Sequence, residues 1–401
     1  MTPSVQAPQR ERYDVVIVGG AMMGSSAAWW LSREAGFDGS VLVVEREPSY
    51  EGSSTAATNS CMRQQFSNEV NIRISQFAAE FVRTFQDWFD DPEVPALATD
   101  HFGYMYLADN DTFAETLRAN QRLQASWGAG TQILSPDEIA AAYPFYNLDG
   151  IVCGSHNLVD EGYFDGGTMF DTWRRQARRN GVEYARDEVV AIAHTGGLVT
   201  SVELASGASI ECGTLVNAAG PRASEVAAMA GLELPVEPRK RYSFVFQAAE
   251  PLDRALPLTI DPTGVHCRTD GGYYQAGCAP DDDHAVDATD TRLDPDIWED
   301  KVWPVLANRI PAFERIKVVN KWAGHYAYNT LDQNVIVGPH PELGNLVFMN
   351  GFSGHGLQQS PAIGRGVAEL IAYGEFRSID LTPLGVERII AKTPFVETAV
   401  I

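Results

Sequence analysis

The hydrophobic and polar positions at the start of the chain predict a strand, a glycine-rich turn, a helix and a second strand. Residues 12–18 form a continuous run with several β-branched residues, which is typical of a buried parallel strand. A helix is expected over residues 21–35 and a second apolar strand over 41–44. A strand, a helix and a strand within about 30 residues indicate the opening of a βαβ fold.

The rest of the chain alternates between helical and strand-like patterns. A helix is predicted over 169–180, where apolar residues recur every three or four positions and Asn180-Gly181 ends the pattern. Asp270-Gly271-Gly272 predicts a hairpin turn, and residues 281–296 predict an acidic loop. Further elements are expected as strands at 182–184, 189–192, 199–204, 215–219, 335–337 and 346–349, and as a helix at 362–373.

These patterns indicate two domains, of which the first is discontinuous. Residues 12–80, 150–235 and 325–390 are assigned to a nucleotide-binding domain, because the α/β pattern of the opening returns there. Residues 239–277 contain short strands and turns, so 81–149 and 236–324 are assigned to a largely antiparallel substrate domain. The predicted fold class is therefore α/β plus α+β.

Charge and composition exclude some classes of partner. The 401 residues carry 30 Lys and Arg against 53 Asp and Glu, a formal net charge of −23, which disfavours nucleic acid and anionic membranes. Residues 15–32 lack charge, but glycine and serine pairs within them argue against a membrane span. The five cysteines are widely spaced, so no disulfide framework and no metal site is expected. The first residues lack the apolar run of a secretory signal, which makes a cytoplasmic location the default expectation.

The glycine-rich turn carries the first candidate chemistry. Gly19, Gly20 and Gly24 follow a strand and begin a helix, where backbone amides can face a pyrophosphate. The middle glycine of the usual GxGxxG pattern is replaced by Ala21, and Met22 and Met23 complete the turn. Glu45 ends the second strand, where an acidic side chain accepts hydrogen bonds from ribose hydroxyls and repels a 2′-phosphate. These residues disfavour NADP and leave NAD and FAD open.

Residues 12–66 resemble the FAD-dependent amine and amino-acid oxidoreductase family, which includes sarcosine oxidase, dimethylglycine dehydrogenase and D-amino-acid oxidase. REPSYEGSSTAATNSCMRQQFS is similar to the family segment after the ribose acid, in which small hydroxyl residues contact the phosphates and flavin. VNAAGPRAS is similar to a turn that closes over the nucleotide, and RDEVVAI to the segment that holds adenine. The resemblance thus implies these further FAD-binding residues: Arg46, Ser53, Ser54, Thr55, Val189, Ala219 and Gly220.

The C-terminal part of the chain extends this resemblance. NGFSGHGLQQS is similar to the family loop and helix start beneath the flavin pyrimidine, whose residues here are Gly351, Phe352, Ser353, Gly354, His355 and Gly356. A helix N-terminus there stabilises negative charge on reduced flavin. The resemblance implies a Rossmann-like FAD-binding domain of the glutathione-reductase type beside an antiparallel substrate domain. RKRYSFVF and RQQFS resemble one branch in particular, the mitochondrial FAD-dependent oxidoreductase domain proteins linked to respiratory-complex assembly.

Two sequence positions at which related enzymes attach FAD covalently bear on whether a covalent link is expected here. Thr55 stands where the dimethylglycine dehydrogenase branch has an attachment histidine, and a threonine cannot form that link. His325 stands where sarcosine oxidase has an attachment cysteine. A histidine can be alkylated by a flavin methyl group, but more often it lines the pocket. Noncovalent FAD is therefore expected.

The resemblance also implies substrate-side residues. Arg63 is similar to the family arginine that grips a substrate carboxylate, although a structural ion pair is an equal alternative. Gln275 and Gln358 replace two family lysines, of which one promotes reaction with oxygen and the other holds a carboxylate. A dehydrogenase that passes electrons to a carrier flavoprotein or quinone is therefore expected instead of a fast oxidase using oxygen. Candidate pocket-lining side chains, none assigned as a base, are His355, Tyr242, Tyr274, Tyr326 and Tyr328.

The leading hypothesis is an FAD-dependent enzyme that oxidises the C–N bond of a small secondary or tertiary amine, such as an N-methyl amino acid. It implies hydride transfer to flavin N5, for which positioning and desolvation do much of the work. A primary amino-acid or opine oxidase is the second hypothesis. A noncatalytic flavoprotein that assists assembly is the third. An aromatic hydroxylase fits least, because those enzymes have a GD motif where this chain has GFSGHG.

Overall fold

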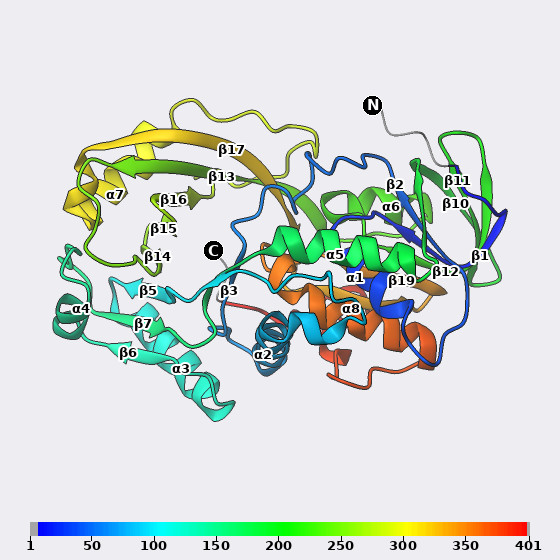
Figure 1. Ribbon diagram of the computed structural model, residues 1–401, viewed down its shortest axis with the longest axis horizontal. Helices are drawn as coiled ribbons and strands as arrows, with labels where there is room; N and C mark the ends of the chain where they lie inside the picture. Colours follow the sequence, from blue (N-terminus) through cyan, green and yellow to red (C-terminus); the bar gives the residue numbers. More distant parts are fainter. Residues whose placement is uncertain (1–6, 399–401) are drawn as a thin grey trace.

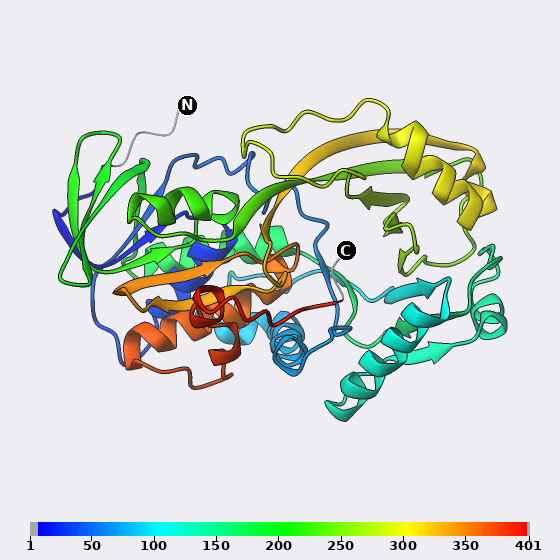
Figure 2. The same cartoon turned by 180° about the vertical axis from the view of Figure 1, so that it is seen from behind.

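The computed structural model describes residues 7–398. Two lobes are each built on an eight-stranded sheet, and a three-stranded sheet lies with them (Figure 1). The long strands β13 (Val236–Ala248) and β17 (Ile316–Asn329) run between the lobes (Figure 2). The predicted combination of an α/β lobe and an antiparallel lobe is confirmed.

The first sheet has β1 (Arg12–Val18) at its centre. Parallel neighbours of β1 are β2 (Val41–Glu45) on one side and β12 (Ser209–Asn217) on the other. The sheet is completed by β9 (Glu183–Arg186), β10 (Val189–Thr195), β11 (Leu198–Leu204), β18 (Ile336–His340) and β19 (Leu343–Asn350). Because β1, β2, β12 and β19 are parallel, their carboxyl ends meet at one edge of the sheet, where a cofactor is expected to bind.

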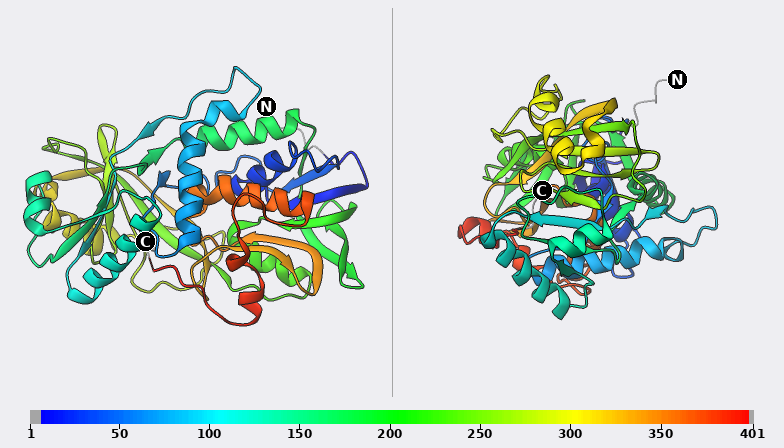
Figure 3. Two further views of the ribbon diagram at one scale, coloured as in Figure 1. Left: turned by 90° about the horizontal axis from the view of Figure 1, so that it is seen from below. Right: turned by 90° about the vertical axis from the view of Figure 1, so that its left-hand side faces the viewer.

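Alternating side chains of β1 build a core on each face of this sheet. Val15 and Ile17 face the helices α1 (Met22–Leu31), α5 (Gly166–Arg179) and α8 (Gly356–Tyr373), which lie side by side (Figure 3). Val16 and Val18 face the opposite side, with α6 (Ala223–Met229). Helix α2 (Glu69–Arg83) packs against α8 and contributes to the first of these cores.

The second sheet forms the other lobe. Its strand order is β17, β13, β16 (Tyr273–Cys278), β15 (His266–Asp270), β14 (Leu258–Ile260), β5 (Tyr104–Ala108), β7 (Cys153–Asn157) and β6 (Gln132–Leu134). All pairs are antiparallel except β14 with β5. The predicted hairpin turn is confirmed, because Asp270 pairs with Tyr273 across two glycines.

The remaining elements are shorter or lie at the rim. The third sheet contains β3 (Cys61–Met62), β4 (Thr99–Asp100) and β8 (Gly162–Phe164). The other α-helices of the described residues are α3 (Asp111–Ser126), α4 (Pro136–Ala142), α7 (Trp303–Arg309) and α9 (Glu387–Ile390). In residues 7–398, no helix combines the length and the apolar character that a bilayer crossing requires.

Two helix boundaries differ from the prediction for local reasons. The helix expected over 21–35 ends at Leu31, where the hydroxyl of Ser32 donates to the Trp29 carbonyl. The helix expected from residue 362 begins at Gly356 and contains Pro361. Proline has no N–H to donate to the carbonyl four residues earlier. The hydroxyl of Ser360 donates to that carbonyl, on Leu357, at 2.7 Å, so the helix continues through the proline.

Strand pairing also differs from the expected division of the chain. β7 belongs to the second sheet, because it pairs with β5 and β6, although residues 150–157 were expected in the nucleotide-binding domain. β17 is one continuous strand across the boundary expected at residue 325. The sequence analysis did not predict α2 and α3, although the buried apolar residues of α2 recur every three or four positions.

Candidate active site

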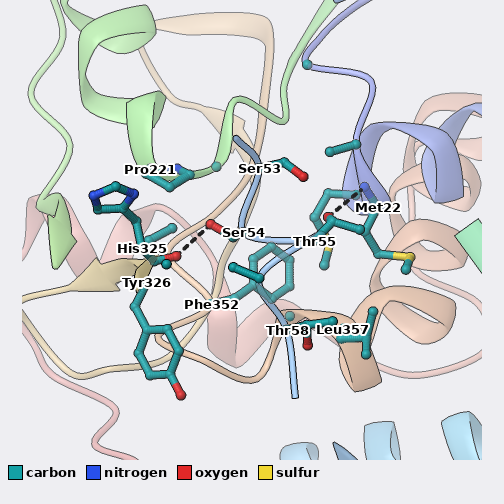
Figure 4. Close-up of a pocket in the computed structure, with 18 of the residues that line it drawn as sticks. Met22, Ser53, Ser54, Thr55, Thr58, Pro221, His325, Tyr326, Phe352 and Leu357 are labelled. Carbon is teal, nitrogen blue, oxygen red and sulfur yellow. Dashed lines mark hydrogen bonds between the residues drawn. The ribbon is translucent and has the colours of Figure 1, made fainter. Parts of the chain in front are cut away.

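A continuous cavity lies where the two lobes meet. It is lined by the glycine-rich turn, residues 50–63, the 187–189 and 218–222 segments, the start of α8 and one face of the second sheet. Figure 4 shows part of it, with Ser54 and Thr55 between the end of β17 and the start of α1. Segments far apart in the sequence therefore build one site, as the predicted cofactor and substrate residues require.

The glycine-rich turn has no space for side chains at Gly19 and Gly24. Gly19 has φ +95°, and a Cβ there would lie 2.6 Å from the Ala218 carbonyl oxygen. A Cβ on Gly24 would lie 1.9 Å from the Gly19 oxygen, so neither position accepts a side chain. Ala21 is the N-cap of α1 and provides no side-chain cap, and the first helical turn has no acidic residue. The N-terminus of α1 thus has no acidic partner of its own and can bind an anionic group, although Thr55 Oγ1 accepts from the Met22 amide.

Glu45 is fixed by the same turn. Its Oε2 accepts from the Gly20 amide at 2.8 Å, and its Oε1 accepts from the Glu47 amide at 2.7 Å. Burial raises the pKa of Glu45, although these two hydrogen bonds act in the opposite direction. Each carboxylate oxygen can accept a second hydrogen bond. Glu45 can therefore hold ribose hydroxyls, as expected, and Arg46 beside it also lines the cavity.

Three small hydroxyl residues line the cavity, and two of them connect their segment to β17 and to α1. Ser54 donates to the His325 carbonyl at 2.6 Å, and Thr55 Oγ1 accepts from the Met22 amide at 3.3 Å (Figure 4). Ser53 donates to the Tyr50 carbonyl at 2.6 Å. All three line the cavity, and their hydrogen bonds also fix the segment that leads to Arg63.

Most of the predicted cofactor residues line the cavity directly. Those that do are Gly19, Ala21, Met22, Met23, Glu45, Arg46, Ser53, Ser54, Thr55, Val189, Ala219, Gly220, Phe352, Gly354, His355 and Gly356. Those that do not are Gly20, Gly24, Gly351 and Ser353. Ser353 instead accepts from the Asn329 amide at 2.9 Å and so shapes the loop before α8. His355 is the N-cap of α8 without a side-chain cap, which leaves that helix N-terminus open as well.

Arg63 lies buried at the far end of the cavity. Its guanidinium is 2.8 Å from Nε2 of His355 and stacks over the ring of Phe66, with Tyr104 and Tyr106 nearby. Burial lowers the pKa of Arg63, but Tyr106, Tyr104, Glu397 and Glu161 outweigh that effect and raise it above the ordinary value. Arg63 is therefore a permanent cation facing the cavity.

Gln358 supports Arg63 from the first turn of α8. Its Oε1 accepts from the backbone amide of Arg63 at 2.8 Å, and its Nε2 donates to Ser75 at 3.4 Å. Gln358 also lines the cavity. Both ends of its amide are therefore engaged within the protein.

Gln275 does not line the cavity, which corrects the expectation for this residue. Its Nε2 donates to Asn59 Oδ1 at 2.6 Å, and its Oε1 accepts from Arg268 at 2.5 Å. Asn59 lies between Gln275 and the cavity and lines the wall together with His266. Gln275 lies in a strand, as predicted. Residues 57–60 cover it, and no local sequence pattern indicates that arrangement.

His266 is a cavity residue that sequence analysis missed. Asn59 Oδ1 already accepts from Gln275, so Asn59 Nδ2 donates to His266 Nε2, at 3.2 Å. Burial lowers the pKa of His266 to about 4, so the ring is neutral at pH 7. Gly277, the cross-strand partner of His266, leaves room for the ring, because a Cβ there would lie 2.5 Å from His266 Nε2.

The four candidate tyrosines separate into two groups. Tyr242 and Tyr326 line the cavity. Tyr274 instead packs in the core of the second lobe, where its hydroxyl accepts from the Leu252 amide at 2.8 Å. Tyr328 lies beneath the guanidinium of Arg239, outside the cavity lining. Successive side chains of a strand point to opposite faces of the sheet. Gln275 points to the cavity side, so its neighbour Tyr274 points to the core on the other face.

His325 lines the cavity near the end of β17. Its side chain points away from that of Tyr326 (Figure 4), and Nε2 donates to the Asp290 carbonyl at 2.9 Å. Burial lowers the pKa of His325. Asp290 belongs to the predicted acidic loop, which also binds Lys240 at 2.8 Å and reaches the cavity at Ala288.

Comparison with known proteins identifies the family. The family described as FAD dependent oxidoreductase matches residues 14–370. The chain belongs to that family. The family's cofactor fits the geometry, because the N-terminus of α1, the glycine-rich turn and Glu45 lie together at one end of the cavity. FAD is therefore the cofactor of this protein.

Relatives extend over nearly the whole chain. FAD-dependent oxidoreductase domain-containing protein 1 of Xenopus laevis is 38% identical over 435 residues, covering 100% of this chain and 87% of the relative. Sarcosine oxidase subunit beta of Rhizobium meliloti is 25% identical and covers 92% and 86%. The structure of L-proline dehydrogenase from P. horikoshii superposes with a TM-score of 0.82 and 25% identity, covering 95% and 98%.

Proposed function

We propose that this protein is a dehydrogenase of small amino acids whose nitrogen is a secondary or tertiary amine. Arg63, buried at the cavity end away from Glu45, is the observation that carries the proposal. A buried guanidinium suits a carboxylate, because its planar fork can make two parallel hydrogen bonds. FAD, when bound, accepts the hydride that leaves the substrate carbon.

The distribution of acidic residues supports a neutral amine. Among the described residues lining the cavity, the carboxylates are Glu45, Glu47, Asp187, Glu188 and Glu225. All of them belong to segments at the nucleotide end. The lining around Arg63 is made by residues such as Tyr104, His266 and Tyr326, which offer no carboxylate to an ammonium group. An amine with its lone pair free is the form whose C–H can be oxidised.

The proposed reaction is a two-electron oxidation of the substrate C–N bond. A secondary amine loses a hydride from carbon and its N–H proton, so that the C–N single bond becomes an imine. A tertiary amine loses only the hydride and becomes an iminium. Water then hydrolyses that product to a carbonyl compound and an amine. The names of two relatives mention sarcosine and L-proline, which both have a secondary amine beside a carboxylate. This shared chemistry supports the substrate class.

A carrier flavoprotein or quinone is the proposed electron acceptor. Asn59, His266 and Gln275 are neutral, and the nearby Arg268 already pairs with Asp270 at 2.8 Å. A cation close to the flavin would favour the negative charge that develops when oxygen is reduced. Arg241, the other cation near His266, pairs with Asp283 at 2.8 Å. Because both cations near His266 are already paired with carboxylates, this part of the wall supports slow reaction with oxygen.

The test is anaerobic bleaching of the flavin with paired compounds. L-proline and sarcosine are expected to bleach it, whereas pyrrolidine and dimethylamine, which lack the carboxylate, are expected to be at least about 100-fold less efficient. Arg63→Lys retains the charge but loses the fork, so about 100-fold in kcat/KM should be lost, or about 2.7 kcal/mol. Bleaching by pyrrolidine as fast as by L-proline would contradict the proposal. Absence of bleaching with every amino acid would favour a noncatalytic flavoprotein.

A further inference from the structure

The C-terminal segment packs against the start of α2, a few residues after Arg63 in the sequence. Figure 2 shows the last residues, in red, returning from the first lobe toward the middle of the molecule. Residues 393–398 contain no helix or strand, yet Glu397 is completely buried. A carboxylate is rarely buried without several hydrogen-bond donors around it.

Glu397 has four such donors, all near the start of α2. One oxygen accepts from the amide and the hydroxyl of Ser67, at 2.8 and 2.6 Å. The other accepts from Nδ2 of Asn68 and of Asn71, at 2.7 and 2.9 Å. Asn68 is the N-cap of α2, and its Oδ1 accepts from the Asn71 amide at 3.1 Å. Glu397 thus fixes both the N-cap and the residue before it.

The path of the segment is itself fixed by a buried ion pair. Asp332 accepts from Arg388 Nε at 2.7 Å and from the Phe395 amide at 3.0 Å. The Glu397 amide donates to the Asp332 carbonyl at 3.2 Å. The carboxylate of Glu397 therefore arrives at α2 on a rigid support.

The residues that Glu397 holds adjoin Arg63 directly. Ser67 follows Phe66, whose ring lies 4.5 Å beneath the Arg63 guanidinium. The other end of the stretch is held separately, because Gln358 accepts the Arg63 amide and Glu161 accepts the Gln64 amide at 2.7 Å. Side chains from three distant parts of the sequence therefore hold residues 63–67 in place.

We infer that Glu397 is a positioning residue for substrate binding, which holds Phe66 and Ser67 so that the Arg63 guanidinium meets the substrate carboxylate. This inference rests on the proposed function, because it takes Arg63 as the carboxylate-binding group. Glu397 also lies close enough to Arg63 to favour its charged form. Its carboxylate sits at the N-terminus of α2, where a negative charge is stabilised.

Glu397→Gln is the informative substitution. The four partners of Glu397 at the start of α2 are donors, two to each carboxylate oxygen, so the amide NH₂ of glutamine must face two of them and lose those hydrogen bonds. Glu369→Gln is the matched control. Glu369 is equally buried and accepts from Arg365, Arg377 and Ser378, but it lies in the second half of α8 and contacts none of residues 63–67.

The holoenzyme variants are compared by binding of cyclopentanecarboxylate, which has the shape of proline without the amine, measured from the flavin absorption spectrum. Glu397→Gln should raise Kd for this carboxylate at least tenfold and raise KM for L-proline, with kcat and FAD affinity nearly unchanged. Glu369→Gln should leave both values within twofold of wild type. Ser67→Ala should raise Kd less, and it should add little when combined with Glu397→Gln.

Two outcomes overturn the inference while leaving the proposed function intact. One is an unchanged Kd in folded, FAD-loaded Glu397→Gln while Arg63→Lys loses binding. The other is an equal rise in Kd in Glu397→Gln and Glu369→Gln, which would show a general loss of stability. If wild type and Arg63→Lys bind the carboxylate equally weakly, the proposed function fails as well.

Discussion

The backbone amide of Arg63 donates to the side-chain oxygen of Gln358 at 2.8 Å, although 295 positions separate the two residues in the sequence. The hydrogen bond connects Arg63 to α8, whose N-terminus lines the cavity. It also gives Gln358 a task that a lysine cannot perform, because an ammonium group has no acceptor.

Gln358→Lys is therefore expected to weaken carboxylate binding. The ammonium group would leave the Arg63 amide without its acceptor and would lie close to a second cation. We expect kcat/KM for L-proline to fall about tenfold or more, measured anaerobically with an artificial acceptor. Gln358→Met removes both hydrogen bonds without adding charge and separates the two effects. Tighter binding of cyclopentanecarboxylate by Gln358→Lys would contradict this role.

Reoxidation of the reduced enzyme by air is expected to be slow. Stopped-flow mixing of reduced enzyme with oxygen measures the second-order rate constant, and a rapid reaction would refute the prediction. Gln275→Lys is not expected to create an oxidase, because the new cation would lie beside Arg268 under Asn59. A buried cation without a partner should lower the free energy of unfolding by about 3 kcal/mol or more, measured by denaturant titration.

FAD is expected to dissociate when the protein is unfolded. Thr55 cannot form the attachment bond, and the ring of His325 is held by the hydrogen bond from its Nε2 to the Asp290 carbonyl. The intact mass of the denatured protein should equal the mass calculated from its sequence. His325→Ala serves as the comparison and should retain the same yellow, releasable cofactor. A mass greater by one FAD in wild type but not in His325→Ala would show a covalent link.

Glu161 is expected to make stability depend on pH. It accepts from the Gln64 amide, Gln65 and Asn157, and burial raises its pKa to about 7. The folded protein therefore holds a proton that the unfolded chain, with an ordinary pKa of 4.5, releases earlier. Between pH 4.5 and 7 the folded state binds more protons, so this group's contribution to stability falls as pH rises.

Glu161→Gln removes that titration. The unfolding free energy of the variant should decline less steeply than that of wild type between pH 5 and pH 7, as measured by denaturant titration at several pH values. Glu138→Gln, at an exposed helix cap, is the control and should keep the wild-type slope in that range. Parallel curves for wild type and Glu161→Gln would show that Glu161 does not titrate there.

The nucleotide end of the cavity could be predicted from the sequence, because its geometry is local. Gly19 and Gly24 are required by contacts within one turn, and Glu45 comes to that turn because β1 and β2 are parallel neighbours. Such features depend on strand and helix periodicity and on glycine sterics over a few dozen residues.

The surroundings of Arg63 were decided only by the tertiary structure. Its supports come from Gln358, Glu161 and Glu397, and Asn59 covers Gln275 because two lobes meet at that place. The sequence by itself determined the fold class and, through its resemblance to a family, the cofactor, and it singled out Arg63 as a candidate substrate residue. Which side chains hold that arginine depends on contacts between distant segments, and these follow from the packing of the lobes, which no local periodicity encodes.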